Sequence, residues 1–456
     1  MCGMRWVATT GCIFLFVLAG FAGADEPSFR ARLVGGIIDL DTGDTSNLGG
    51  VSAAWNGADA EFRVAWFDSR ITGQNDVYAQ RVSADGGLLG DNVTIVSGSS
   101  SQTETSIAHD PARNRYLVKW KNQSGEPGSP GFNHSYGALA SPGGGLIGDV
   151  LDISNAGLES TLLYSPTSDE YFLTARNFAG GGAAGIYARR VSGEGDIVGG
   201  SIIIATSGAP GPNGQAAHDR NADRYLATWR DQSAECLKGR LINADGTFFS
   251  SAFVISALFP ESTLAATVAF DPGDDRYFVV LSEFCAGRMY GQFVTSSGDL
   301  DGSPFLIDDS SPARTFPSMA YDGVHDVFLV VWQNSDTGRL TARLVADDGT
   351  LLGEPLSLDN PGGASGPPCV TANPDAGGFL VAWVDHVWED PAQHDVLARR
   401  IGVCCAADFD CDGDIDTADL LFLLSAWGTG AGDLDGDGDT DTADLLGLLA
   451  GWGQCP

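Results

Sequence analysis

The chain has 456 residues, of which 59 are acidic and 25 basic, so its formal net charge is −34. This balance excludes general nucleic-acid binding, which needs a basic face to meet the phosphate backbone. The 61 glycines predict many tight turns, and the scarcity of lysine and other strong helix formers favours an all-β structure for the long middle section.

Residues 1–24 have the three parts of a secretory signal peptide. Arg5 supplies the positive charge, an apolar run extends from Gly11 to Gly20, and Ala22 and Ala24 frame a small-residue cleavage site. The run is too short to span a bilayer, and no later stretch has the length of a membrane helix. We therefore expect cleavage after Ala24, a secreted and extracellular mature chain, and no membrane span.

The middle of the chain, residues 25–402, repeats one pattern seven times. An aromatic residue is followed four positions later by tryptophan in five units, and the second place is relaxed in two. The pairs are Phe62/Trp66, Tyr116/Trp120, Tyr171/Ala175, Tyr225/Trp229, Tyr277/Leu281, Phe328/Trp332 and Phe379/Trp383. The units start 51 to 55 residues apart, and all but the last show four strand signals. This period predicts a seven-bladed β-propeller of four-stranded blades, with an open solenoid or two packed sandwiches as alternatives.

The seventh unit shows only three strand signals, the last of which ends at Ile401. The segment from Val34 to Leu40 has the pattern of a strand but belongs to no unit. We expect it to complete the last blade, because a closed ring removes the open edges of a linear array. The repeated aromatic residues are interpreted as packing between neighbouring sheets rather than as ligand contacts.

Two ladders of alternating aspartates occupy the C-terminal segment, residues 403–456. The first is Asp408, Asp410, Asp412, Asp414, Asp416 and Asp419, and the second, 25 residues later, is Asp433, Asp435, Asp437, Asp439, Asp441 and Asp444. These are positions 1, 3, 5, 7, 9 and 12 of an EF-hand-type loop, with Gly413 and Gly438 at the sixth position, where the loop turns sharply. Because like charges at close range disfavour ionisation, so many carboxylates need a hard cation nearby. The ladders therefore predict two calcium ions.

A short apolar segment follows each ladder, from Leu420 to Gly428 and from Leu445 to Gly453. Each segment predicts a helix too short to persist alone, so we expect the two helices to pack together as a small all-α module with metal-closed loops. The alternative, a solvated acidic tail, leaves the apolar segments without an explanation.

Seven cysteines remain after signal removal, and export favours disulfides. A bridge from Cys405 to Cys455 would join the ends of the module, and Cys411, at a loop position that is not a ligand position, is the other candidate. Cys236 and Cys285 occupy similar places in adjacent units and form a further candidate pair. The odd number leaves at least one thiol free or intermolecular.

The duplicated pattern D-x-D-x-D-G-x-x-D-T-A-D-L-L resembles dockerin type I modules over residues 406–453. The resemblance implies calcium binding and attachment to a cohesin-like or other extracellular scaffold protein of a polysaccharide-degrading complex. Recognition in that family depends on loop positions 10 and 11, which here are Thr417, Ala418, Thr442 and Ala443. The two repeats are closer together than in typical dockerins, with only residues 429–432 between the first helix and the second loop.

The propeller sequence carries no nucleophile elbow, zinc-protease motif or phosphate-binding loop. His109 and His218 are each followed by aspartate, but Phe270 and Tyr321 hold the same place in other units. We therefore interpret both histidines as structural residues in an aromatic position.

Two functional classes are consistent with these features. In the first, which we favour because the sequence carries no catalytic signature, the propeller is a recognition or scaffold domain that the C-terminal module attaches to an assembly. In the second, the chain is a polysaccharide-degrading enzyme, either a glycoside hydrolase or a lyase, and this class depends on family association alone. One set of polar loop residues would suit an anionic sugar, although polar loops are also an ordinary protein surface: Arg70, Arg230, His386 and Trp388.

Overall fold

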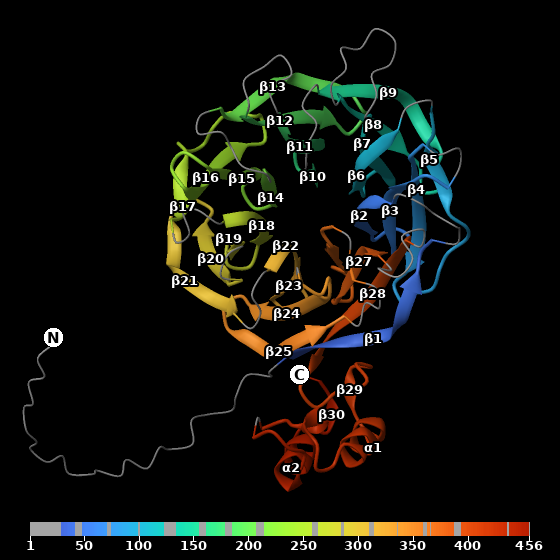
Figure 1. Ribbon diagram of the computed structural model, residues 1–456, viewed down its shortest axis with the longest axis vertical. Coiled ribbons are helices and arrows are strands. Elements are labelled where there is room, and N and C mark those ends of the chain that lie inside the picture. The colour runs from blue at the N-terminus through green and yellow to red at the C-terminus, as the bar shows by residue number, and fades with distance from the viewer. Residues whose placement is uncertain are drawn as a thin grey trace, which may run out of the picture.

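The computed structural model describes residues 29–41, 48–70, 74–98, 101–122, 134–154, 161–177, 185–206, 214–257, 263–283, 287–309, 314–334, 336–358, 363–364, 366–386, 394–435 and 437–455. In these residues the chain forms seven four-stranded antiparallel sheets around a central axis, and a small module with two short helices lies at the rim (Figure 1). The predicted fold class, a seven-bladed β-propeller followed by a small helical module, is confirmed. No helix in the described residues has the length and apolar character that crossing a membrane requires.

Blades 1 to 6 each use four consecutive strands. Blade 1 contains β2 (Gly49–Asn56), β3 (Glu61–Asp68), β4 (Asp76–Ser83) and β5 (Val93–Val96), and blade 2 contains β6 (Gln102–Asp110), β7 (Arg115–Asn122), β8 (His134–Ala140) and β9 (Leu146–Ser154). Blade 3 contains β10 (Leu162–Ser165), β11 (Glu170–Asn177), β12 (Gly185–Ser192) and β13 (Ile197–Ala205), and blade 4 contains β14 (Gln215–Asp219), β15 (Arg224–Asp231), β16 (Cys236–Asn243) and β17 (Phe253–Ser256). Blade 5 contains β18 (Thr263–Asp271), β19 (Arg276–Glu283), β20 (Met289–Thr295) and β21 (Leu300–Asp308), and blade 6 contains β22 (Arg314–Asp322), β23 (Val327–Asn334), β24 (Leu340–Ala346) and β25 (Leu351–Ser357).

Blade 7 combines strands from both ends of the chain. It contains β26 (Cys369–Ala372), β27 (Phe379–His386), β28 (His394–Cys405) and, as its outer strand, β1 (Phe29–Asp39). β1 runs antiparallel to β28, from Phe29 opposite Cys405 to Asp39 opposite Leu397. This is the pairing expected from the missing strand signal, and it begins five residues before Val34. The closed ring leaves β28 hydrogen-bonded on both sides.

The second strand of each blade is apolar on both faces because a neighbouring sheet covers each face. Its tryptophans are at most 2% exposed: Trp66, Trp120, Trp229, Trp332 and Trp383. Large rings buried at this position contribute a large apolar area to the packing between adjacent blades. The packing interpretation of the repeated aromatic residues is confirmed.

His109 and His218 take the aromatic position of the repeat, as the sequence predicts, and pack on the second strand. The His109 ring centroid lies 4.9 Å from that of Tyr116, and the His218 centroid lies 4.9 Å from that of Tyr225. Blade 6 has the same 4.9 Å spacing with Tyr321 in place of histidine. Burial lowers the pKa of both histidines, so the rings are neutral at pH 7.

Lys119 on β7 is a buried cation within the ring and gives a stability prediction. Its Nζ donates to the Glu104 carbonyl at 3.2 Å, and burial lowers its pKa to about 8. The ordinary pKa of lysine is 10.5. Between pH 8 and pH 10.5, Lys119 therefore holds its proton more often in the unfolded chain than in the folded one, and the stability of the fold rises with pH in this window. We expect Lys119→Met to raise the melting temperature at pH 7 and the gain to shrink by pH 10, measured by thermal unfolding at both pH values. An equal gain at both would show that the burial of charge is not the cause.

Candidate metal centre

The C-terminal module consists of two copies of a loop followed by a helix. Its elements are β29 (Asp414–Ile415), α1 (Thr417–Ser425), the 3-10 turn η1 (Gly430–Gly432), α2 (Thr442–Ala450) and β30 (Gly453–Gln454), with β29 paired to β30. Leu423 of α1 and Leu448 of α2 are fully buried, and Ile415 joins them. A domain of this size with so small a core needs further support from disulfides or metal.

The last two aspartates of each ladder form a capping box at the start of a helix. The Asp416 carboxylate accepts from the Ala418 amide at 2.7 Å, and the Asp419 carboxylate accepts from the Asp416 amide at 2.8 Å. Asp441 and Asp444 form the same capping box at α2, with 2.7 Å for both bonds. These carboxylates satisfy free amides of the first turn and interact favourably with the helix dipole.

The two loops share a set of hydrogen bonds. Asp408 Oδ2 accepts from the Gly413 amide at 3.1 Å, and Asp433 Oδ2 accepts from the Gly438 amide at 2.9 Å. Gly413 and Gly438 have φ angles of 96° and 101°, a region that favours glycine. The twelfth-position aspartate also accepts from the amide of the second loop position, at 2.6 Å in both copies. The sequence duplication is therefore a duplication of loop geometry.

Ladder carboxylates meet in three clusters, in each of which oxygen atoms from three residues lie within 4.8 Å of one another. The clusters are Asp408, Asp410 and Asp419 in the first loop, and Asp433, Asp435 and Asp444, then Asp437, Asp439 and Asp441, in the second. The remaining three aspartates of the first loop are exposed and, in the described part of the chain, belong to no cluster of that kind: Asp412, Asp414 and Asp416. Ligand positions 1, 3 and 12 thus come together in both loops.

The donor set of the first loop fits a hard cation. Asp408 and Asp419 are 1% and 0% exposed. Burial first, and then the charges of Asp419 and Asp410, raises the pKa of Asp408. Calcium takes about six to eight oxygen ligands and would offset both the burial and the mutual repulsion of these carboxylates.

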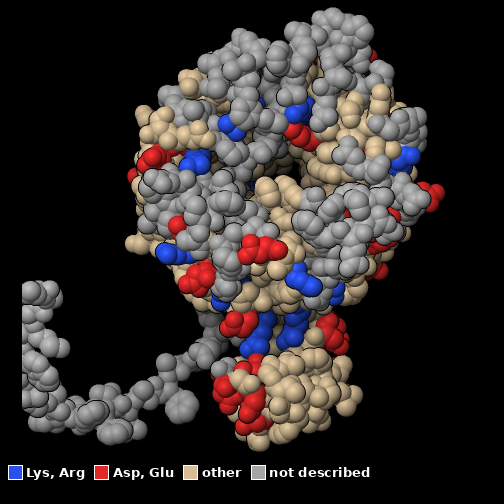
Figure 2. Space-filling view, in the orientation of Figure 1, with Lys and Arg blue, Asp and Glu red and all other residues tan. Residues whose placement is uncertain are grey.

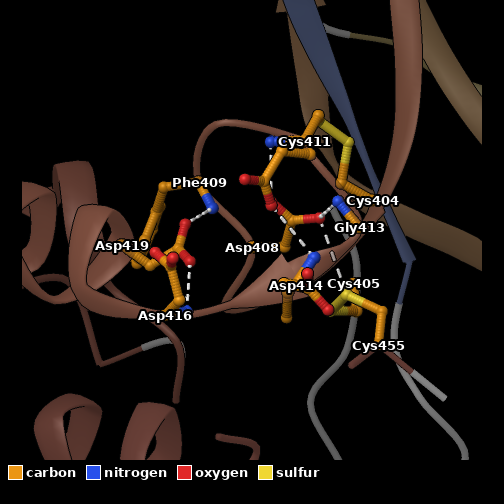
Figure 3. The surroundings of a disulfide bond; sticks show 12 residues. Cys404, Cys405, Asp408, Phe409, Cys411, Gly413, Asp414, Asp416, Asp419 and Cys455 are labelled. Carbon is orange, nitrogen blue, oxygen red and sulfur yellow. Dashed lines mark hydrogen bonds between the residues drawn. A yellow bond between two sulfur atoms is a disulfide. The ribbon is translucent and has the colours of Figure 1, made fainter. Parts of the chain in front are cut away.

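Two disulfides join the module to the last propeller strand (Figure 3). Cys405 pairs with Cys455 and Cys404 pairs with Cys411, with Cα atoms 6.0 and 5.3 Å apart. The predicted bridge between Cys405 and Cys455 is confirmed, and Cys411 holds the first loop against β28. The other candidate pair involves Cys285, which lies outside the described residues.

Two arginines from β1 hydrogen-bond to backbone carbonyls of the module. Arg30 Nη1 donates to the Asp433 carbonyl at 2.8 Å, in the second loop. Arg32 Nη2 donates to the Ala406 carbonyl at 2.9 Å, and its guanidinium lies 4.5 Å from the centroid of the Phe409 ring, in the first loop. Figure 2 shows basic side chains between the ring and the module, flanked by acidic ones. The module is thus docked on the strand that closes the ring.

The polar residues predicted for an anionic sugar do not form a demonstrated site. Arg70 is held by Asp68 and Asp41, with Nη2 to carboxylate distances of 2.6 and 2.7 Å, and its guanidinium lies 4.2 Å from the Tyr78 ring centroid. These contacts give Arg70 a structural role. Arg230 is half-buried on β15; the His386 side chain and Trp388 lie outside the described residues.

An apolar surface on the module was not predicted. The exposed large apolar residues that have a counterpart in the other copy, called here the apolar face, are the helix residues Leu421, Leu424, Leu446 and Leu449 and the tryptophans just after each helix, Trp427 and Trp452. Equivalent residues are exposed to nearly the same extent, 63% for both Leu421 and Leu446 and 45% and 47% for Trp427 and Trp452. A second leucine stripe at helical spacing was the signal in the sequence. The predicted partner residues lie at the exposed helix starts: Thr417, Ala418, Thr442 and Ala443.

Comparisons with known proteins support the fold and nothing finer. No family model and no curated protein matches this chain. Hydrazine synthase of Kuenenia stuttgartiensis is similar with a TM-score of 0.51 and 12% identity, over 77% of this chain and 96% of that chain. A protein of unknown function from Dyadobacter fermentans DSM 18053 is similar with a TM-score of 0.50 and 12% identity, over 82% of this chain and 99% of that one. At such identities the likeness identifies the chain as a β-propeller protein and says nothing of its activity.

Proposed function

We propose that this chain is an exported calcium-binding protein whose propeller is a recognition or scaffold domain and whose C-terminal module attaches it to an extracellular or cell-surface assembly. The observation that carries the proposal is the duplicated loop, in which positions 1, 3 and 12 bring three carboxylates within 4.8 Å in both copies. The capping bonds explain Asp416, Asp419, Asp441 and Asp444, whereas the convergence of positions 1 and 3 on position 12 in both copies is what a bound cation would explain.

Two calcium ions would be held by the two ladders. In the first loop the side-chain ligands are Asp408, Asp410, Asp412, Asp416 and Asp419, and Asp414 contributes its backbone carbonyl. In the second loop they are Asp433, Asp435, Asp437, Asp441 and Asp444, and Asp439 contributes its carbonyl. The ions would supply positive charge to the loops and so stabilise the module.

The apolar face supports the attachment role. Leu421 and Leu446 are 63% exposed, and the two tryptophans of the face are nearly half exposed. Large apolar and aromatic side chains gathered on a small domain are typical of protein–protein interfaces. Together with the exposed Thr417 and Thr442, this face suits a cohesin-like or other extracellular scaffold protein.

Calorimetric titration of the full secreted chain with calcium tests the proposal. We expect two ions per chain, and one ion per chain for the Asp435→Asn/Asp444→Asn variant, because asparagine removes two negative charges from the second loop. Asp299→Asn, an exposed aspartate in a blade 5 hairpin, is the matched control and should keep both ions. No heat on calcium addition, or a stoichiometry unaffected by the loop variant, would refute the proposal. Magnesium should bind more weakly, since it demands a smaller and more rigid octahedral shell.

A further inference from the structure

The propeller holds a cavity of about 650 Å³ on its central axis, called here the funnel. The funnel lies at the end of the ring where each first strand turns into the second, and all seven blades contribute to its lining. Figure 1 shows the first strands β2, β6, β10, β14, β18 and β22 gathered around the centre. The volume falls within the range of about 300 to 1,000 Å³ that is typical of small-ligand sites.

The lining changes in character from the strands to the turns. Along the first strands it is made of apolar side chains, including Ala54, Ala108, Ala217, Ala269 and Ala372. At the second-last position of the first strand, next to the turn, rings from six successive blades form what we call the aromatic collar: Trp55, His109, Tyr164, His218, Phe270 and Tyr321. The charged residues of the lining are Arg220 of blade 4 and Asp375 of blade 7.

The collar is held in place by the protein itself. The Tyr164 hydroxyl donates to Asp169 at 2.8 Å, and the Tyr321 hydroxyl donates to Asp326 at 2.6 Å. The indole Nε1 of Trp55 donates to Asp375 at 2.8 Å. One side of each tyrosine ring packs on the aromatic residue of the adjacent second strand, with centroids 4.9 Å apart. A ligand therefore meets rings whose orientation is already fixed, which lowers the entropy cost of binding.

The charges around the opening disfavour an anionic ligand. The turns that surround it, residues 56–61, 110–115, 165–170, 219–224, 271–276, 322–327 and 373–378, carry 13 acidic and 5 basic side chains. Such an excess repels anions. The anionic sugar considered for the loops that hold Arg70 and Arg230, at the opposite end of the ring, is therefore not a suitable ligand for the funnel.

The same excess would attract a cation to the opening, but the lining itself offers a cation little. Most acids of the turns are already engaged, as Asp169 is with Tyr164 and Arg113 and as Asp223 is with His218. Among the acids of the turns, Asp375 lines the funnel. Arg220 lies in the same lining, and its positive charge offsets the negative charge of Asp375. What the funnel offers is aromatic surface together with a few planar polar groups and no net charge in the lining.

We propose that the funnel binds a neutral oligosaccharide, with sugar rings against the aromatic collar and hydroxyl groups hydrogen-bonded to Asp375 and Arg220. Pyranose rings present apolar C–H faces to aromatic rings and hydroxyl edges to planar polar groups, so an uncharged sugar matches both parts of the lining. The proposal rests on the recognition role proposed above for the propeller and names its ligand class and its site.

Titration of the full chain with neutral hexasaccharides of glucose, xylose and mannose tests the site, with an oligogalacturonate and spermine as charged probes. We expect saturable binding of a neutral sugar with a change of tryptophan emission that Trp55→Phe abolishes. The Tyr164→Ala/Tyr321→Ala variant should bind about tenfold more weakly. Arg220→Gln, at an exposed position where folding is not at risk, should weaken binding severalfold. Phe248→Ala, 46% exposed outside the funnel, should bind like the parent.

If none of the three neutral sugars binds, the inference is overturned. It is also overturned if the Tyr164→Ala/Tyr321→Ala variant and the Arg220→Gln variant both bind the sugar as tightly as the parent chain does. Binding of the oligogalacturonate or spermine alone would overturn it in favour of a charged ligand. Repeating the titration with a calcium chelator separates this site from the metal loops, because sugar affinity in the funnel should persist while metal is removed.

Discussion

A chain that begins at Asp41, and so lacks β1, is expected to lose the single cooperative unfolding transition of the ring and to form oligomers. Without β1 the twelve-residue strand β28 becomes an exposed edge, which is a template for pairing with another chain. Ile401 and Val403, now 1% and 9% exposed, would lose the cover of Leu33 and Ala31. Size-exclusion chromatography with light scattering and thermal unfolding followed by tryptophan emission measure both effects.

The matched control begins at Phe29 and keeps β1 whole. We expect it to be monomeric and to melt like the mature chain. If the chain that begins at Asp41 also stays monomeric and melts at the same temperature as this control, closure by β1 is not what holds the ring together.

Calcium is expected to raise the melting temperature of the ring as well as that of the module, and the Arg30→Met/Arg32→Met variant should lose the gain in the ring. From the strand that closes the ring, Arg30 hydrogen-bonds to a carbonyl of the second loop, and Arg32 hydrogen-bonds to the carbonyl of Ala406, just before the first loop, and packs on Phe409 within it. Metal that orders the loops therefore also holds β1 in place. A ligand at a hundredfold excess over its Kd stabilises the state it binds by about 2.7 kcal/mol.

Emission from the propeller tryptophans reports on the ring, because Trp66 and Trp383 are fully buried there. Arg189→Met, at a half-buried arginine on β12 of blade 3, is the control and should keep the calcium-dependent gain in full. Calorimetry should still find two ions in the Arg30 and Arg32 variant, since neither arginine is a ligand. A calcium-dependent gain of the same size in that variant would show that the module and the ring unfold independently.

The features that were predictable from the sequence are those set by spacing along a short stretch of chain. The interval between units gave the number of blades, and the missing strand signal led to β1. The alternation of aspartates gave the loop positions, and their capping contacts follow from residues three apart, such as Asp416 and Asp419. His109 and His218 were assigned correctly because other units place Phe270 and Tyr321 there.

The features that were not predictable depend on residues that meet only in the folded ring. Arg30 contacts a carbonyl 403 positions away, and no local pattern marks such a pair. The start of β1 at Phe29 depends on β28 continuing to Cys405, beyond the boundary expected at residue 402. The funnel requires seven turns to converge on one axis. Calcium binding and the partner of the module stay proposals, because the spacing and geometry of the residues indicate which ligands would fit and do not reveal which ligands are bound.

The continuity of β28 with the module determines how the protein would respond to mechanical tension. Only Ala406 and Ala407 separate Cys405, the last residue of β28, from Asp408. A pull on an anchored module is transmitted along β28, which is bonded to β1 on one side and to β27 on the other. The hydrogen bonds that pair β28 with β1 and with β27 then share the load in shear instead of opening one after another. An anchored ring of this design would resist flow or drag at its attachment point without a flexible tether.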